Sequence, residues 1–125
     1  FHALWLVDPS AAAPLRKRRL TTPGGRYLGG MDGLARDGDH IVAIQNLVGL
    51  GRVWRFRVDA AAEHVDDLQL LLRQHPDLRN PTTGVVVGRR FLFVVDPKLQ
   101  VFADQAMTLA PAGRRGHRIL ALPLP

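Results

Sequence analysis

Short apolar runs separated by turn residues recur along the whole chain, and this pattern predicts strands. The clearest strand runs from Arg52 to Asp59. In it Trp54, Phe56 and Val58 alternate with arginines, the period-two pattern of a strand with one buried face. The other strands predicted in this region lie near Gly33 to Arg36, Ile41 to Gln45 and Val65 to Leu72.

Two further features refine the predicted strands. Asp37-Gly38-Asp39, between the first two of them, is a typical sequence for a tight hairpin turn. Phe91 to Val95 is a continuous apolar run, which predicts a strand covered on both faces. The chain is therefore expected to be an all-β protein.

A repeat of 51 residues organises these elements. Gly33 and Gly84 are 51 residues apart, and Val7 and Val58 have the same separation. The same offset places His40 to Ile44 over Phe91 to Val95. It also places the turn-rich segment Thr22 to Gly25 over the segment that contains Gln74, His75 and Pro76.

The segment from Glu63 to Gln74 fits two structures. Its residues Val65, Leu68 and Leu71 also have helical spacing, so a short helix is an alternative. We prefer a strand, because the repeat partner of this segment, Pro14 to Leu20, has no helical stripe of apolar residues.

Four strands and a long loop in each unit are typical of a β-propeller blade, whose period is usually about 40 to 45 residues. Residues 1–22 would supply the end of one blade, 23–74 a complete blade and 75–125 most of a last blade. We therefore expect a partial β-propeller of about two and a half four-stranded antiparallel blades. Since propellers close with about four to eight blades, the chain should be a fragment that self-associates through exposed blade edges.

Composition narrows the classes of partner. The formal net charge of +6 comes largely from one run, Arg16 to Arg19, with no nucleic-acid-binding motif or aromatic stacking platform, so no nucleic-acid partner is expected. No membrane partner is expected, because no apolar stretch approaches the ~18 residues of a membrane span. Cysteine is absent, which excludes disulfides and thiolate chemistry and leaves the compartment open.

Several segments resemble the gluconolactonase, regucalcin and luciferin-regenerating-enzyme group of six-bladed propellers. They are Gly30-Met31-Asp32-Gly33-Leu34, Ile44-Gln45-Asn46, Gly51-Arg52-Val53-Trp54-Arg55, His75-Pro76-Asp77 and Asn80-Pro81-Thr82-Thr83-Gly84-Val85-Val86-Val87-Gly88. The resemblance covers nearly the whole chain. It implies that the final run, His117 to Leu124, is the closing strand and that the N-terminal blades are missing.

The resemblance also implies a chemistry. Such proteins hold one divalent metal on the central axis, calcium first, with zinc, manganese or magnesium as alternatives, and they hydrolyse a small lactone or ester. Asp32 is the expected metal ligand and catalytic base. Asn46, Thr83 and His75 are expected to line the substrate pocket. The other ligands of the group, a glutamate and asparagines from earlier blades, have no counterpart in this chain.

Each candidate also has a structural interpretation. Asp32 precedes a glycine and Asn46 precedes a turn, both common places for backbone capping. Thr83 could be a hydroxyl staple within its loop, and His75 a solvated loop residue. The five histidines have no zinc-site spacing. The alternative to a hydrolase is therefore a non-catalytic propeller that serves as a binding module or survives as a truncated, inactive remnant.

Overall fold

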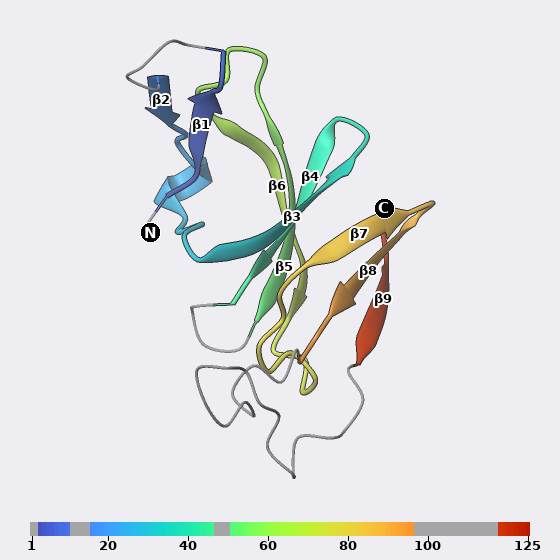
Figure 1. Ribbon diagram of the computed structural model, residues 1–125. Coiled ribbons are helices and arrows are strands. Elements are labelled where there is room, and N and C mark those ends of the chain that lie inside the picture. Colours follow the sequence, from blue (N-terminus) through green and yellow to red (C-terminus); the bar gives the residue numbers. More distant parts are fainter. Residues whose placement is uncertain (1–2, 11–15, 47–50, 97–117) are drawn as a thin grey trace, which may run out of the picture.

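The computed structural model describes residues 3–10, 16–46, 51–96 and 118–125. Within these ranges the chain forms nine strands in three antiparallel sheets (Figure 1). The strands are β1 (Trp5–Asp8), β2 (Arg16–Arg19), β3 (Met31–Asp37), β4 (His40–Gln45), β5 (Arg52–Val58), β6 (Val65–Arg73), β7 (Gly84–Val87), β8 (Arg90–Val94) and β9 (Ile119–Pro123). One 3-10 turn, η1 (Pro23–Gly25), precedes β3. None of the described segments is a helix of the length and hydropathy needed to cross a bilayer.

The four-stranded sheet has the order β3-β4-β5-β6, so each strand pairs with the next along the chain. This confirms the four strands predicted for this region. Gly38 has a φ of 63° in the β3–β4 turn, a conformation that favours glycine and explains the strong hairpin signal. Residues 65–73 form a strand, so the helical alternative is wrong.

Each face of the four-stranded sheet contributes to a hydrophobic core, and β4 supplies side chains to both cores. Val42 and Ile44 enter a core shared with β8, whereas Ala43 enters a second core beneath the N-terminal segment. The first core consists of Val42, Ile44, Val53, Leu78, Phe91, Phe93, Val95 and Leu124. The second core consists of Leu20, Leu28, Ala43, Trp54, Phe56 and Val65.

The three-stranded sheet, β7-β8-β9, corrects one expectation and adds a pairing that the sequence did not predict. In β8, Phe91 and Phe93 are buried while Leu92 and Val94 are half-buried, so only one face of this strand is fully covered. By the 51-residue offset β9 corresponds to part of β6, a fourth strand, yet it pairs directly with β8 as a third strand does. Residues 103–109, the repeat equivalent of much of β5, lie outside the described residues.

The two-stranded sheet is a ribbon in which every residue of β1 and β2 is exposed. It continues to Leu20, whose N–H donates to the oxygen of Leu4 at 3.0 Å. Thr21 then joins the start of β6, since Val65 N donates to Thr21 O at 2.7 Å. The segment from Thr21 to Leu28 therefore connects the ribbon to the four-stranded sheet.

The first strands of the larger sheets, β3 and β7, lie side by side (Figure 1). Gly33 of β3 faces the backbone of Thr82 and Thr83, which precede β7. Gly51 likewise faces the ring of Pro81. The absence of a side chain at these two glycines thus lets the four-stranded sheet approach the loop that precedes β7.

Candidate functional site

Asp32 lies at an irregularity near the start of β3. Met31 pairs with Gln45 and Gly33 pairs with Ile44, so Asp32 is an extra residue opposite β4. A β-bulge of this kind redirects a side chain and interrupts the regular ladder. The carboxylate of Asp32 is accordingly exposed at the end of the sheet where β4 finishes.

Asn46, the residue after β4, binds this carboxylate. Its Nδ2 donates to Oδ2 of Asp32 at 2.6 Å and to the backbone oxygen of Pro81 at 3.1 Å. Its backbone N–H donates to Gly30 O at 3.2 Å. One half-buried amide therefore connects the start of β3, the end of β4 and the loop before β7.

Thr83 lies beside this pair. Its Cα would be 3.0 Å from a β-carbon added to Gly33, the residue after Asp32. The loop is held to β8 through backbone groups, because Thr82 N donates to Val94 O and Val94 N donates to Thr83 O, each at 3.1 Å. The structure thus brings three of the predicted site residues, Asp32, Asn46 and Thr83, to one place.

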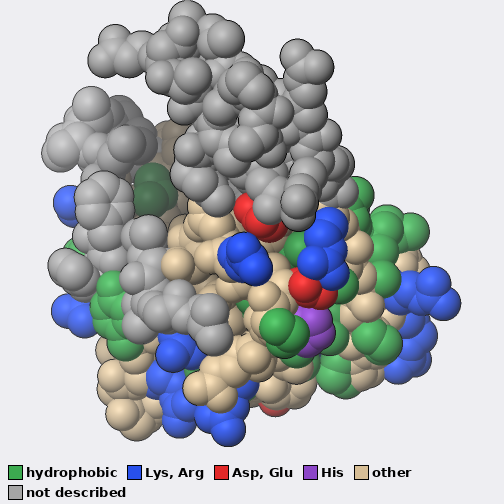
Figure 2. Space-filling view, turned by 90° about the horizontal axis from the view of Figure 1, so that it is seen from below, with side chains coloured by type: hydrophobic (Ala, Val, Ile, Leu, Met, Phe, Trp, Pro, Cys, Tyr) green, Lys and Arg blue, Asp and Glu red, His purple; other side chains and the backbone are tan. Residues whose placement is uncertain are grey.

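His75 belongs to a different cluster. Its Nδ1 accepts from the backbone N–H of Asp77 at 3.3 Å, and Asp77 forms two contacts of 2.6 Å with the guanidinium of Arg118. Among the described residues, no hydrogen bond or ion pair that we find joins His75 to Asp32, Asn46 or Thr83. Acidic, basic and histidine side chains lie side by side on the face seen from below in Figure 2.

The donor set at Asp32 suits a hard cation only in part. Carboxylate and amide oxygens are the ligands that calcium prefers, but calcium takes six to eight of them. Within the described ranges, no group of three or more histidine or acidic side chains is placed to hold a metal. Asp32 and Asn46 therefore do not by themselves make a metal site within the described residues.

Sequence reasoning missed a second polar cluster at the opposite end of the β3–β4 hairpin. His40, nearly buried, donates from Nε2 to Oδ2 of Asp67 at 2.8 Å, and its Nδ1 lies 2.6 Å from Oδ1 of Asp39. The hydrogen bond from His40, followed by one from Gln69, holds the pKa of Asp67 below its ordinary value. Asp67 has a φ of 46°, so a strained residue in β6 directs this carboxylate.

No spacing rule signals this contact, because His40 and Asp67 are brought together by the pairing of three strands. The one available signal was a histidine at the start of an apolar strand, and such a residue is more often structural than catalytic.

Comparison of the chain with protein-family models, curated proteins and solved structures found no match in any of the three.

Proposed function

We propose that this chain is the C-terminal part of a propeller of the gluconolactonase-like group, a divalent-metal-dependent hydrolase that acts on a lactone or ester. The observation that carries the proposal is the 2.6 Å hydrogen bond between Asn46 and Asp32 at the junction of β3, β4 and the β7 loop. In a propeller the innermost strands surround the axial pocket. The side-by-side position of β3 and β7 supports this arrangement.

Asp32 is the proposed catalytic base. It would take a proton from water, whose oxygen bonds to the acyl carbon of the substrate while the bond to the ring or ester oxygen breaks. The proton passes to that departing oxygen, and the product is a hydroxy acid, or an acid and an alcohol. Asn46 would keep the Asp32 carboxylate oriented. Thr83, which is exposed, would contact the substrate beside it. His75 would contribute at the pocket rim.

A bound metal would polarise the acyl oxygen. Asp32 is the described residue that would hold it, with the Asn46 side chain adjacent. The remaining ligands would come from outside the described residues. A site with so few ligands predicts weak binding by this chain, with a Kd of about a millimolar or higher.

Paramagnetic broadening tests this site directly. With the amide resonances of the chain assigned, traces of Mn²⁺ should broaden the side-chain amide of Asn46 and the backbone amide of Gly33 before other signals. Asp32→Asn should abolish this selectivity, whereas Asp39→Asn, at the opposite end of the hairpin, should preserve it. Selective broadening around Asp39 or His40 instead would contradict the assignment.

Hydrolysis of glucono-δ-lactone, followed by proton release in the presence of Ca²⁺, tests the reaction. Because the metal site is incomplete among the described residues, we expect the unchanged chain to add only a small increment to the spontaneous rate, and we expect Asp32→Asn to remove that increment. Asp39→Asn serves as the charge-matched control and should keep the increment. An increment of equal size in Asp32→Asn and the unchanged chain would overturn the role of Asp32.

One observation favours the non-catalytic alternative. Asn46 donates to the backbone of Pro81 as well as to Asp32, which is what a purely structural joint between two sheets would do. If the contact is only a structural joint, Asn46→Ala should lower the melting temperature. Asp32→Asn should then change neither the Mn²⁺ broadening nor the rate of lactone hydrolysis. Measuring stability beside the metal response therefore separates the two functions.

A further inference from the structure

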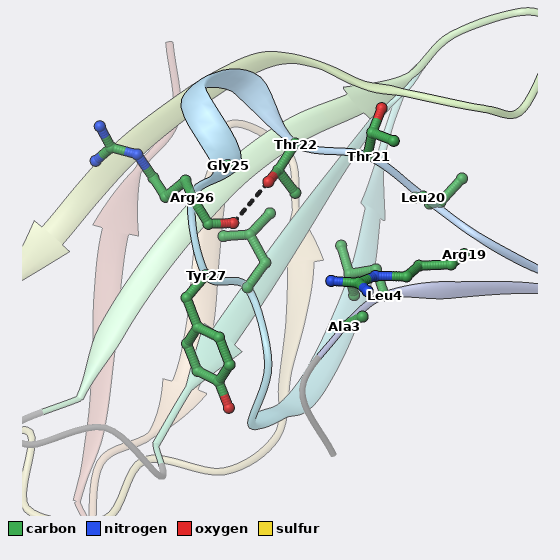
Figure 3. Close-up of a pocket in the computed structure, with 10 residues that line it drawn as sticks. Ala3, Leu4, Arg19, Leu20, Thr21, Thr22, Gly25, Arg26 and Tyr27 are labelled. Carbon is green, nitrogen blue, oxygen red and sulfur yellow. Dashed lines mark hydrogen bonds between the residues drawn. The ribbon is translucent and has the colours of Figure 1, made fainter.

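A cavity of about 500 Å³ lies where the β1–β2 ribbon meets the segment Thr21 to Leu28 (Figure 3). This volume is within the usual range of small-molecule sites, about 300–1,000 Å³. Asp32 and Asn46 are not among its lining residues, so the cavity is separate from the proposed hydrolytic site.

The floor of this cavity is apolar. Leu4, Leu20 and Leu28 line it, and Leu20 and Leu28 belong to the second core, with exposures of 6% and 2%. Because these side chains are fixed by packing against Trp54 and Phe56, the floor is preformed. Such a surface favours an apolar ligand group over water.

The rim of the cavity is cationic. Arg19 and Arg26 line it, and no acidic side chain does so among the described residues. In Figure 3 the side chain of Arg19 extends towards the middle of the lining residues, whereas that of Arg26 points outwards. Arg26 lies over the ring of Trp54, with the guanidinium carbon 5.8 Å from the ring centre.

Two other basic residues of β2 have protein partners, and Arg19 differs from these two. Arg18 bonds to Glu63 at 3.1 Å, and Lys17 lies 5.4 Å from the centre of the Trp5 ring. We find no carboxylate paired with Arg19 within the described ranges. A guanidinium directed over an apolar floor without a carboxylate is suited to bind one from a ligand, in the two-pronged geometry that arginine provides.

We propose that this cavity is a binding site for a small carboxylate with an apolar body. The carboxylate pairs with Arg19, and the apolar body rests on Leu4, Leu20 and Leu28. Tyr27, which is 42% exposed, also lines the cavity. This assignment is independent of the hydrolase proposal, because it uses none of the same residues.

Tyr27 makes the test specific, since it is the only tyrosine in the sequence. The probe is 4-phenylbutyrate, and its neutral amide is the matched control. We expect 4-phenylbutyrate to shift the Tyr27 ring resonances of the full chain in a saturable manner. The amide should bind at least about tenfold more weakly, because a charge-assisted hydrogen bond is lost.

Arg19→Gln should weaken 4-phenylbutyrate binding by a similar factor of about ten, and Arg19→Lys should restore it only in part. Arg16→Gln removes the same charge from the same exposed strand on its opposite face, and it should leave binding unchanged. The proposal is overturned if Tyr27 does not respond to the probe, if acid and amide bind equally, or if Arg16→Gln weakens binding as much as Arg19→Gln. The acid and amide comparison needs no variant, so the test does not depend on the folding of any substituted chain.

Discussion

Gly33 lies so close to Thr82 that a β-carbon at residue 33 would stand nearer than 3.0 Å to the Thr82 carbonyl oxygen. Real β-carbons essentially never make such a contact, and the opposing atom belongs to the backbone. The same loop accepts the hydrogen bond from Asn46 at Pro81. The alignment of Asp32, Asn46 and Thr83 therefore depends on the absence of one side chain.

Gly33→Ala should destabilise the protein by about 1–3 kcal/mol, the usual cost of overpacking, because the β3–β7 contact must open to admit the methyl group. Urea denaturation measures the change. Leu34→Ala is the control at the next position of β3, where the side chain is 59% exposed, and it should change stability by less than about 0.5 kcal/mol. Equal stability of Gly33→Ala and the unchanged chain would mean that the two sheets do not meet there.

The buried amide of Gln45 should be essential for stability. Its Oε1 accepts from Nε1 of Trp54 at 3.0 Å, and its Nε2 donates to Gly29 O at 2.7 Å. Gln45→Leu leaves both partners buried without a hydrogen bond, so we expect a loss of about 2–4 kcal/mol. Denaturant unfolding followed by tryptophan fluorescence gives this value.

A double variant tests the same pair more sharply. Trp54→Phe removes the donor that Gln45→Leu leaves unsatisfied. The two substitutions together should therefore cost less than the sum of their separate effects. Strict additivity would show that the two side chains do not interact.

Stability should fall on acidification through the Asp67 carboxylate. Because contact with His40, then Gln69, lowers the pKa of Asp67 in the folded chain, its stabilising effect is present above the unfolded pKa of about 3.9. The effect is lost as the pH falls below that value through the folded pKa. Asp67→Asn should therefore be less stable than the unchanged chain at pH 7, and the difference should shrink as the pH falls below about 4. A difference that is constant with pH would exclude this carboxylate as the source.

The exposed edge of β1 should promote association of the chain with itself. Trp5, Leu6 and Val7 are 50%, 42% and 48% exposed, and β1 pairs with β2 alone in the described part of the chain. Strand edges of this kind pair with other chains unless a charge interrupts them. Since burying a valine contributes about 1.5–3 kcal/mol, Val7→Lys should raise the concentration needed for association by roughly tenfold.

Sedimentation velocity over a concentration series measures this association. Ala60→Lys adds the same charge in an exposed turn between β5 and β6, and it should not alter the result. If both variants associate like the unchanged chain, the contact does not involve β1.

The sequence predicted best where one face of a strand is buried and the other is not. Trp54 and Phe56 are 4% and 1% exposed, and Arg55 and Arg57 are half-buried, so the alternation in the sequence matches the burial at these four positions. Val53, buried on the other face, departs from it. Gly38 similarly indicated the β3–β4 turn, because a turn residue with positive φ is usually glycine. These signals are local, and a single sequence displays them directly.

Features that depend on pairing between distant segments were harder to predict from the sequence. The 51-residue offset located β7 and β8 but did not indicate that β9 pairs with β8, because the order of strands in a sheet is set by tertiary packing. The repeat brought Asp32 and Thr83 into correspondence, and both lie at the same junction. His75 shares a loop with Pro81, yet its partners are Asp77 and, through it, Arg118, which no spacing indicated.

The pairing of β8 with β9 also bears on the order of folding. Strands β3 to β6 each join their neighbour in the sequence, whereas β9 must return to β8 from a segment whose first described residue is Arg118. Closing a longer loop costs more chain entropy and slows the contacts that depend on it. We therefore expect the β3–β6 meander to form first and β9 to dock late. In hydrogen exchange the amides of β4 should be the last to open, and those of β9 should open well before them.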